Sequence, residues 1–167
     1  MKKIALIYSF NTKKTALVAE KINKHIPEAD LVNAEDITTE KFLSYENYIL
    51  GVPTWFDGEL PNYWDEFVPA IEDMNLKGKT FAIFGLGDQV NYSENFIDGV
   101  GIMAELLESK GGKVVGFTPS KGYEFEGSRA LKNDKFLGLA VDLENQKKEI
   151  DNKLKSWTDQ LKKEFPK

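Results

Sequence analysis

The stretch that decides the fold reads Gly-Val-Pro-Thr-Trp-Phe-Asp-Gly and spans residues 51–58. It closes the apolar run at residues 48–52 and places Trp55 shortly before the turn-forming residues Asp57 and Gly58. A short apolar run that ends in turn formers is typical of a buried strand in a parallel sheet. This stretch is therefore predicted to be the end of a central strand and the loop that follows it.

Two other segments repeat the pattern. Residues 4–8 form an apolar run that ends in Ser-Phe-Asn-Thr-Lys-Lys-Thr at 9–15, a loop rich in hydroxyl and amide groups. Residues 81–84 run into Gly-Leu-Gly-Asp at 85–88, with Tyr92 just beyond. Because the carboxyl ends of parallel strands share one edge of a sheet, the three loops are predicted to meet there.

Apolar runs and helical periodicity alternate along the chain. Strands are predicted at residues 3–8, 30–33, 48–52, 80–85 and 113–117. Helices are predicted at residues 13–26, 38–43, 63–71, 95–110 and 145–165. This alternation favours an α/β fold, a three-layer sandwich in which helices cover both faces of a five-stranded parallel sheet. Right-handed crossovers favour the strand order 2-1-3-4-5, with ligands at the carboxyl edge.

Residues 118–137 interrupt the alternation. They have few periodic apolar positions, yet Tyr123, Phe125, Leu131 and Phe136 indicate that the segment packs against the rest of the chain. A loop of this length is unusual in a compact domain and is often functional. We interpret it as an insertion into the fifth strand, which resumes near residues 138–141.

The composition fits one soluble domain, residues 1–167, with 41% apolar and 29% charged residues. No apolar stretch approaches the ~18 residues of a membrane span, and the first strand leaves no room for a signal peptide, so a cytoplasmic location is expected. The absence of cysteine excludes disulfides and thiolate chemistry, and the single histidine, His25, excludes serine–histidine and multi-histidine metal sites. Any redox role must therefore come from a bound organic cofactor.

The net charge of −5 is unevenly distributed. Residues 42–109 contain twelve acidic and two basic residues and have a charge of −10, whereas the rest of the chain has 15 acidic and 20 basic residues. The acidic segment contains both aromatic loops. Two interpretations remain open: a solvated surface with dispersed charges, or an acidic face that binds a partner.

The loop at residues 9–15 is a candidate anion site. Backbone N–H groups at a helix N-terminus, together with the helix dipole, favour an anion, and Ser9, Asn11, Thr12 and Thr15 add polar side chains. The loop has neither the Gly-x-x-x-x-Gly-Lys nor the Gly-x-Gly-x-x-Gly spacing of nucleotide-binding motifs. Serine and threonine at this position also serve simply as helix caps, so the loop alone leaves phosphate binding undecided.

Trp55 and Tyr92 are candidates for stacking on a flat ring. Planar aromatic side chains on either side of such a ring would exclude water from it. A loop tryptophan can instead cover the core, and Trp64 and Trp157 are assigned that packing role. Asp88 follows two small residues and can be a helix cap, a surface charge or a ligand contact.

Nearly the whole chain, about residues 3–165, resembles the long-chain flavodoxins. Gly-Val-Pro-Thr-Trp at 51–55, Gly-Glu-Leu at 58–60 and Trp64 resemble the second flavin loop of that family, and Gly-Leu-Gly-Asp-Gln at 85–89, Tyr92 and Asn-Phe at 95–96 resemble the third. The segments 122–125, 128–131 and 135–139 resemble the insertion that separates long-chain from short-chain members. The first loop departs from the usual Thr/Ser-x-Thr-Gly-x-Thr, because Phe10 replaces a hydroxyl residue and Lys13 replaces glycine.

The resemblance implies a flavodoxin-like fold and a non-covalently bound flavin mononucleotide (FMN). By resemblance, residues 9–15 hold the phosphate and the other site residues surround the flavin. The implied cofactor-binding residues are Ser9, Phe10, Asn11, Thr12, Lys13, Lys14, Thr15, Pro53, Thr54, Trp55, Phe56, Asp57, Gly58, Gly87, Asp88, Tyr92, Asn95 and Asp142. The resemblance also implies that the carbonyl of Phe56 turns toward flavin N5 on reduction, a geometry expected to require positive φ at this residue.

The function implied is a low-potential carrier of single electrons, with no catalytic residue and no metal. Its expected partners are redox proteins, such as a flavodoxin or ferredoxin reductase or an oxidoreductase, that dock on an acidic face of a monomer. Neither nucleic acid nor a membrane is expected to bind. The alternatives are an FMN-dependent quinone or NAD(P)H reductase on the same fold, and a phosphate-binding or signalling module without FMN, which would leave Trp55 and Tyr92 unexplained.

Overall fold

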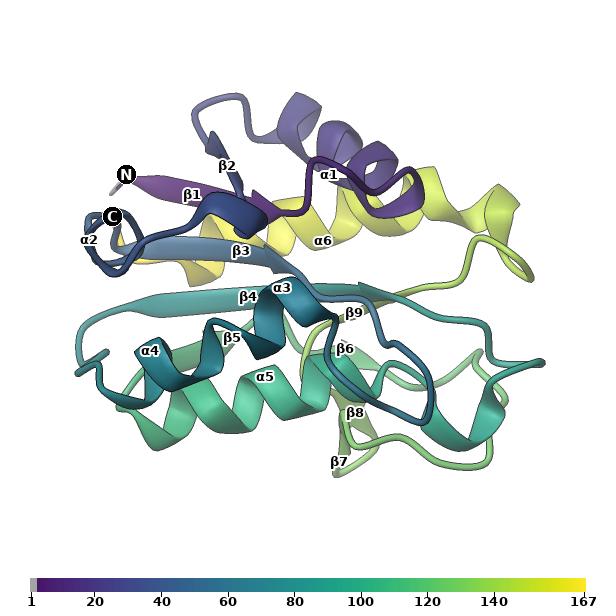
Figure 1. The fold of residues 1–167 in the computed structure, drawn as a ribbon. Helices are drawn as coiled ribbons and strands as arrows, with labels where there is room; N and C mark the ends of the chain where they lie inside the picture. Colours follow the sequence, from purple (N-terminus) through teal and green to yellow (C-terminus); the bar gives the residue numbers. More distant parts are fainter. Residues whose placement is uncertain (1–2) are drawn as a thin grey trace.

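The computed structural model describes residues 3–167, which fold around one parallel sheet with the strand order β2-β1-β3-β4-β5 (Figure 1). The order confirms the predicted flavodoxin-like α/β sandwich. The strands of this sheet are β1 (Ile4–Tyr8), β2 (Asp30–Asn33), β3 (Asn47–Gly51), β4 (Thr80–Leu86), β5 (Lys113–Val115) and β9 (Leu139–Val141). The helices are α1 (Lys14–His25), α2 (Thr39–Leu43), α3 (Asn62–Asp65), α4 (Val68–Glu72), α5 (Asp98–Ser109) and α6 (Ile150–Glu164). Short 3-10 turns are η1 (Ala34–Asp36), η2 (Ser93–Asn95) and η3 (Lys147–Glu149).

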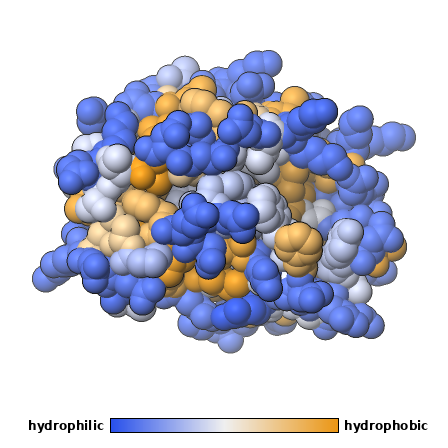
Figure 2. All heavy atoms as spheres, viewed as in Figure 1, coloured by the Kyte–Doolittle hydropathy of each residue, from blue (hydrophilic) through white to orange (hydrophobic). Residues whose placement is uncertain are grey.

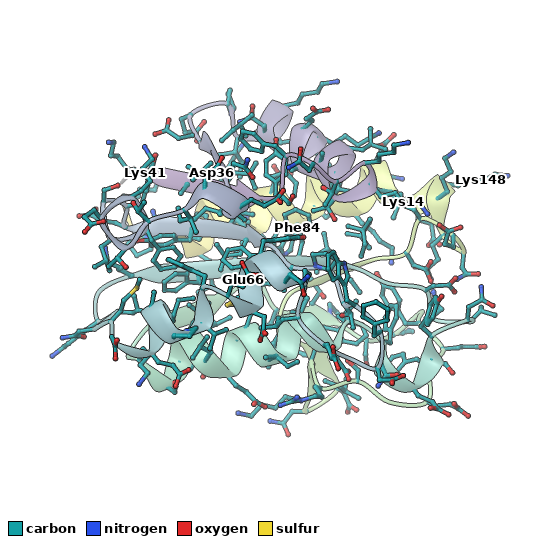
Figure 3. The ribbon with its side chains drawn as sticks, viewed as in Figure 1. Lys14, Asp36, Lys41, Glu66, Phe84 and Lys148 are labelled. Atoms are coloured by element: carbon teal, nitrogen blue, oxygen red, sulfur yellow. The ribbon has the colours of Figure 1, made fainter. Side chains whose placement is uncertain are left out.

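Alternating side chains of the strands divide the core into two layers, one on each face of the sheet. In β1, Ile4 and Leu6 pack on the face covered by α1 and α6, whereas Ala5 and Ile7 pack on the face of α3, α4 and α5 (Figure 1). This is the period-two pattern of a strand that is buried on both faces. Phe84 of β4 lies fully buried between sheet and helices, near the middle of the molecule (Figure 3). Trp64 and Trp157 are also buried, as predicted, and donate from their indole nitrogens to the carbonyls of Gly51 and Gly116, each at 2.9 Å.

The fifth strand is split by the insertion, as predicted from the sequence. β5 pairs with the first half of β4 and β9 with the second half, both in parallel. The residues between them form a small antiparallel sheet of β6 (Thr118–Pro119), β8 (Lys135–Phe136) and β7 (Leu131–Lys132). Tyr123, Phe125 and Phe136 of the insertion surround Phe96 with ring centroids 5.3–5.8 Å from it. The insertion therefore packs directly against the loop that follows β4.

Three helix boundaries differ from the sequence prediction. The helix predicted at 95–110 begins only at Asp98, because Ile97 adopts a left-handed conformation with φ of 47°. The helix predicted at 63–71 is two separate helices, the second of which has Pro69 in its first turn, a position where proline is tolerated. The helix predicted at 145–165 begins at Ile150, after η3. The remaining elements agree with the prediction to within one or two residues.

Within residues 3–167, no helix combines the length and the apolar character needed to cross a bilayer. On the face shown in Figure 2, hydrophilic side chains cover most of the surface, and apolar side chains lie in smaller groups between them.

Candidate functional site

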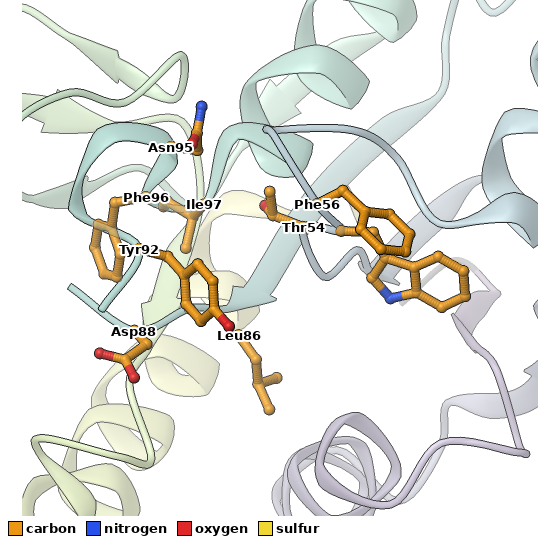
Figure 4. A pocket seen from close by; sticks show the side chains of 10 residues that line it. Thr54, Phe56, Leu86, Asp88, Tyr92, Asn95, Phe96 and Ile97 are labelled. Carbon is orange, nitrogen blue, oxygen red and sulfur yellow. The ribbon is translucent and has the colours of Figure 1, made fainter. Parts of the chain in front are cut away.

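A cleft with a volume of about 530 Å³ opens at the carboxyl edge of the sheet (Figure 4). It lies between the loop after β3 and the loop after β4. In Figure 4, Thr54 and Phe56 lie on one side of the opening, and Tyr92 and Asp88 lie on the other. The lining residues are Thr54, Trp55, Phe56, Leu86, Gly87, Asp88, Tyr92, Asn95, Phe96 and Ile97.

The first wall is a tight turn that presents Trp55. The backbones of Trp55 and Glu59 exchange two hydrogen bonds of 2.8 and 2.7 Å, which close the turn. Gly58 within it has φ of 86°, and a Cβ atom there would lie 2.6 Å from a carboxylate oxygen of Asp98. The turn therefore requires glycine at this position for both its conformation and its contact with α5. The Trp55 indole packs edge-on against the Tyr63 ring, with centroids 6.0 Å apart, and this contact orients it from behind.

Phe56 forms the tip of this turn in a strained conformation. Its φ is 45°, in the left-handed region, and its side chain is 81% exposed. Its carbonyl oxygen accepts a hydrogen bond of 2.8 Å from the Gly58 backbone N–H. The positive φ that was expected only after the peptide turns toward a flavin is thus already present. The energetic cost of this left-handed backbone is therefore present in the turn before any rotation of the Phe56 peptide.

The opposite wall is the loop that carries Tyr92, and Asp88 organises it. The Asp88 carboxylate accepts hydrogen bonds from the backbone N–H groups of Val90 and Asn91 at 3.1 and 3.0 Å, and from the Asn91 amide at 2.8 Å. The Asp88 carbonyl accepts from the Tyr92 N–H at 2.9 Å. Burial alone would raise the pKa of Asp88, but hydrogen bonds from Asn91, Asn145 and Val90 lower this pKa to about 2. Asp88 is therefore an ionised acceptor committed to its own loop, and it leaves the 66% exposed Tyr92 ring at the cleft.

The loop at residues 9–15 lies at the start of α1, beside the same edge. α1 has no side-chain N-cap and no acidic residue in its first turn, so its first N–H groups have no partner within the helix. Thr12 donates from its hydroxyl to the Ser9 carbonyl at 2.7 Å, which tightens the loop. Lys14 lies at this end of the molecule (Figure 3) and forms an ion pair with Glu144, which raises the pKa of Lys14. The combination of uncapped N–H groups, a helix dipole and two lysines suits an anion.

Glu35 of η1 clamps this loop from the side. Its carboxylate accepts hydrogen bonds from the Ser9 hydroxyl and, at 2.7 Å, from the Asn11 amide. These two hydrogen bonds lower the pKa of Glu35. The Asn33 side chain also accepts from the Phe10 N–H at 3.2 Å. The polar side chains of Ser9 and Asn11 are thus engaged with the β2–η1 segment. The N–H groups of Phe10, Asn11 and Thr12 also donate within the protein, so the N–H groups at the start of α1 are the donors that suit an anion.

The comparisons with known proteins agree with this geometry. The family model for flavodoxin matches residues 6–157. A flavodoxin of Nostoc sp. is 42% identical over 98% of both chains, and a flavodoxin of Helicobacter pylori is 38% identical over 99% of both. The chain belongs to the flavodoxin family. This confirms the resemblance and the expectation of an electron-transfer protein rather than an enzyme.

Solved flavodoxin structures have the same fold. A Fusobacterium nucleatum flavodoxin bound to flavin mononucleotide superposes with a TM-score of 0.94 at 33% identity, covering 99% of this chain and 100% of that one. The K13G mutant of the same relative, also bound to flavin mononucleotide, superposes equally well at 32% identity.

The residues proposed from the flavodoxin resemblance divide into three groups in the structure. The cleft is lined by Thr54, Trp55, Phe56, Gly87, Asp88, Tyr92 and Asn95. The helix-start loop holds Ser9, Phe10, Asn11, Thr12, Lys13, Lys14 and Thr15. Outside the lining are Pro53, Asp57, Gly58 and Asp142. Asp142 is fully buried, and its carboxylate accepts from the Gln89 amide at 2.7 Å.

Sequence reasoning missed Leu86, Phe96 and Ile97 as parts of the cleft wall. Phe96 and Ile97 were predicted to lie within a helix, where Phe96 would face the core. The left-handed conformation of Ile97 delays the start of the helix to Asp98, so both residues lie in the loop ahead of it. Phe96 is buried in the core, as predicted, and also lines the cleft. No sequence signal marks the left-handed conformation of Ile97, because isoleucine rarely adopts it.

Proposed function

We propose that this flavodoxin carries electrons one at a time on FMN bound non-covalently in the cleft. The single observation that supports this most directly is the cleft between Trp55 and Tyr92, next to the uncapped start of α1. A flat aromatic ring and an anionic tail on one ligand match these two features. We also infer that the chain works as one domain in the cytoplasm.

The residues present fit FMN on physical grounds. The cleft is walled by aromatic and aliphatic side chains, which favour a planar ring over water. Gly87 also lines the cleft, and the absence of a side chain lets it pack closely on the Phe96 ring, since a Cβ atom there would lie 2.9 Å from that ring. The N–H groups at the start of α1 and the nearby Lys13 and Lys14 would hold the phosphate. Bound FMN supplies the redox chemistry, and the protein positions it and excludes water from it.

The reductase alternative would need a group that moves a proton to or from a substrate. Asp88 is the carboxylate that lines the cleft, and its oxygens are occupied by hydrogen bonds from its own loop and from Asn145. A carboxylate with a pKa of about 2 is a poor general acid or base near neutral pH. The relatives named above are also flavodoxins, which act as electron carriers.

The partner is a redox protein with a basic docking surface. Glu59, Asp65 and Glu66 are exposed beside the Trp55 turn, and their charge would steer such a partner toward the cleft. We infer that the chain acts as a monomer, which leaves this face free. Electron transfer to a basic reductase should therefore slow as the salt concentration rises. An electron-transfer rate that does not change with salt concentration would contradict the acidic docking face. So would a rate that increases when these three acidic residues are replaced by lysine.

The function is tested by titrating the apoprotein with FMN and with riboflavin, followed by an anaerobic redox titration of the complex. We expect FMN to bind more tightly than riboflavin, and two separate one-electron steps. Steady-state NAD(P)H oxidation without an added reductase should be absent. Rapid oxidation would favour the reductase alternative, and failure to bind either flavin would reject both readings.

A further inference from the structure

The turn after β9, residues 142–146, contacts two parts of the proposed FMN site, the start of α1 and the loop that carries Tyr92. Asp142 forms the turn: one carboxylate oxygen accepts from the N–H groups of Glu144 and Asn145 at 3.2 and 3.0 Å. The Gln146 N–H donates to the Asp142 carbonyl at 2.9 Å and completes it. The turn is therefore defined by its own hydrogen bonds rather than by a helix, which begins only at Ile150.

The same turn is hydrogen-bonded to the loop that carries Tyr92. The second oxygen of Asp142 accepts from the Gln89 backbone N–H at 3.1 Å and from the Gln89 amide at 2.7 Å. The Gln89 amide oxygen in turn accepts from the Glu124 N–H at 2.6 Å, which ties the insertion to the same point. Gln89 is 6% exposed, so these hydrogen bonds are shielded from water.

A single amide group links the two carboxylates at this junction. The Asn145 amide nitrogen lies 2.8 Å from an oxygen of Asp88 and 2.9 Å from an oxygen of Asp142. Without this donor, two carboxylates on neighbouring loops would face each other across the gap it fills, and like charges at such short range repel. The amide thus replaces a repulsive contact with two charge-assisted hydrogen bonds.

The neighbouring contacts place the junction between the two halves of the site. Glu144 pairs with Lys14 at the start of α1, and the Gln146 amide donates to the Gly122 carbonyl of the insertion at 2.8 Å. The Lys14–Glu144 pair is exposed and contributes little to stability. A partly buried link runs through Asn145 to Asp88, and from Asp88 to Tyr92.

We propose that Asn145 is a positioning residue that sets the flavin-ring side of the site by bridging Asp88 and Asp142. It does not line the cleft; it acts through Asp88, whose loop presents the Tyr92 ring. The inference rests on the proposed binding of FMN. It assigns Asn145 to the ring and not to the phosphate, so its loss should affect flavins with and without a phosphate equally.

The test compares Asn145→Asp, Asn145→Ala and the matched control Asn152→Asp, which makes the same charge change at an exposed position of α6. At pH 8, both Asn145 variants should bind FMN and riboflavin on the order of tenfold more weakly than the parent protein, the scale of a lost hydrogen bond to a charged group. The control should bind both as the parent does. A loss confined to FMN, or no loss in either Asn145 variant, would overturn the proposal.

Titration separates positioning from simple destabilisation. In Asn145→Asp the new carboxyl would face Asp88 and Asp142, with Lys14, Glu144, Glu149 and Tyr123 as the other titratable groups nearby. Crowding by like charges raises its pKa, so lowering the pH from about 8 to about 5 should protonate it and restore a donor. Riboflavin affinity should then recover in Asn145→Asp and stay weak in Asn145→Ala. Parallel pH dependence in the two variants would contradict the bridge.

Hydrogen exchange in the apoprotein gives a reading that needs no flavin. Both variants should exchange the Val90 and Asn91 amides faster, because the Asp88 carboxylate that accepts from them is no longer fixed. The β1 and β3 amides should remain protected, which shows that the fold is intact. Unchanged exchange at Val90 and Asn91 would overturn the proposal. If the parent protein binds no flavin, the proposed function is rejected. The exchange of the Val90 and Asn91 amides then still tests whether Asn145 holds Asp88 in place.

Discussion

At most positions an alanine variant is more stable to unfolding than a glycine variant, but at Phe56 we expect the glycine variant to be the more stable. Phe56 has φ of 45°, and its side chain is 81% exposed, so removing the ring forfeits little burial. A non-glycine residue in the left-handed region costs about 1–2 kcal/mol, which alanine retains and glycine avoids. Glycine in turn costs about 0.5–1 kcal/mol through the greater freedom of its unfolded chain. Phe56→Gly should therefore be more stable than Phe56→Ala by roughly 0.5–1 kcal/mol.

The neighbouring residue supplies the control, and urea unfolding of the apoproteins supplies the measurement. Asp57 is equally part of the turn but does not have a positive φ. There Asp57→Ala should be more stable than Asp57→Gly by about 0.4–1 kcal/mol, because only the unfolded-chain effect remains. The comparison uses midpoints at equal m-values, so that a change in the unfolded ensemble is not mistaken for strain. If alanine is the more stable residue at both positions, then Phe56 stores no conformational strain.

Three further changes test the site. Trp55→Ala and Tyr92→Ala should each weaken FMN binding by roughly 1–3 kcal/mol, measured by fluorescence titration, if stacking on these rings holds the flavin; unchanged affinity in both would remove them from the site. Lys13→Gly should weaken FMN binding at low salt and leave riboflavin binding unaffected, because the lysine charge lies beside the proposed phosphate site. Tighter FMN binding would show instead that the lysine strains the loop. The K13G mutant of the Fusobacterium nucleatum flavodoxin is bound to FMN, so in that relative the lysine is not indispensable. The pKa of Asp88 in the folded protein, about 2, lies below its value of about 3.9 in the unfolded chain. The ionised Asp88 therefore stabilises the fold above pH 4, and this stabilisation is lost as the pH falls toward 2. Asp88→Asn should lose less stability than the parent over this pH range, and an unchanged dependence of stability on pH would contradict the lowered pKa of Asp88.

The sheet could be predicted because its central strands β1, β3 and β4 each contain an apolar run that ends near a turn former. Residues 4–8 and 80–86 are buried on both faces, and such runs leave few alternatives to a parallel sheet. The cleft followed from the same rule, since the loops after neighbouring parallel strands must meet. The identity of the ligand came from the family resemblance, because the loop at residues 9–15 alone does not distinguish an anion site from a helix cap.

The supporting contacts could not be predicted, because they join residues far apart in the chain without a local pattern. Asn145 reaches Asp88 across 57 positions, and Glu35 reaches Ser9 across 26. The sequence prediction also placed Asn145 at the start of the last helix, which begins only at Ile150. The positive φ at Ile97 is equally invisible in the sequence, since isoleucine rarely adopts this conformation.

The division of the last strand has a consequence for self-association. An exposed sheet edge offers unpaired backbone groups on which a second chain can add a strand, and long flat edges are the most hazardous. Here that edge consists of two three-residue pieces, β5 and β9, with Ile83 of β4 left between them. At that gap Gly138 approaches the Ile83 carbonyl so closely that a Cβ atom would lie 2.1 Å from the oxygen. A foreign strand would therefore find no continuous ladder to extend, so the detour through the insertion also protects the protein from edge-to-edge aggregation.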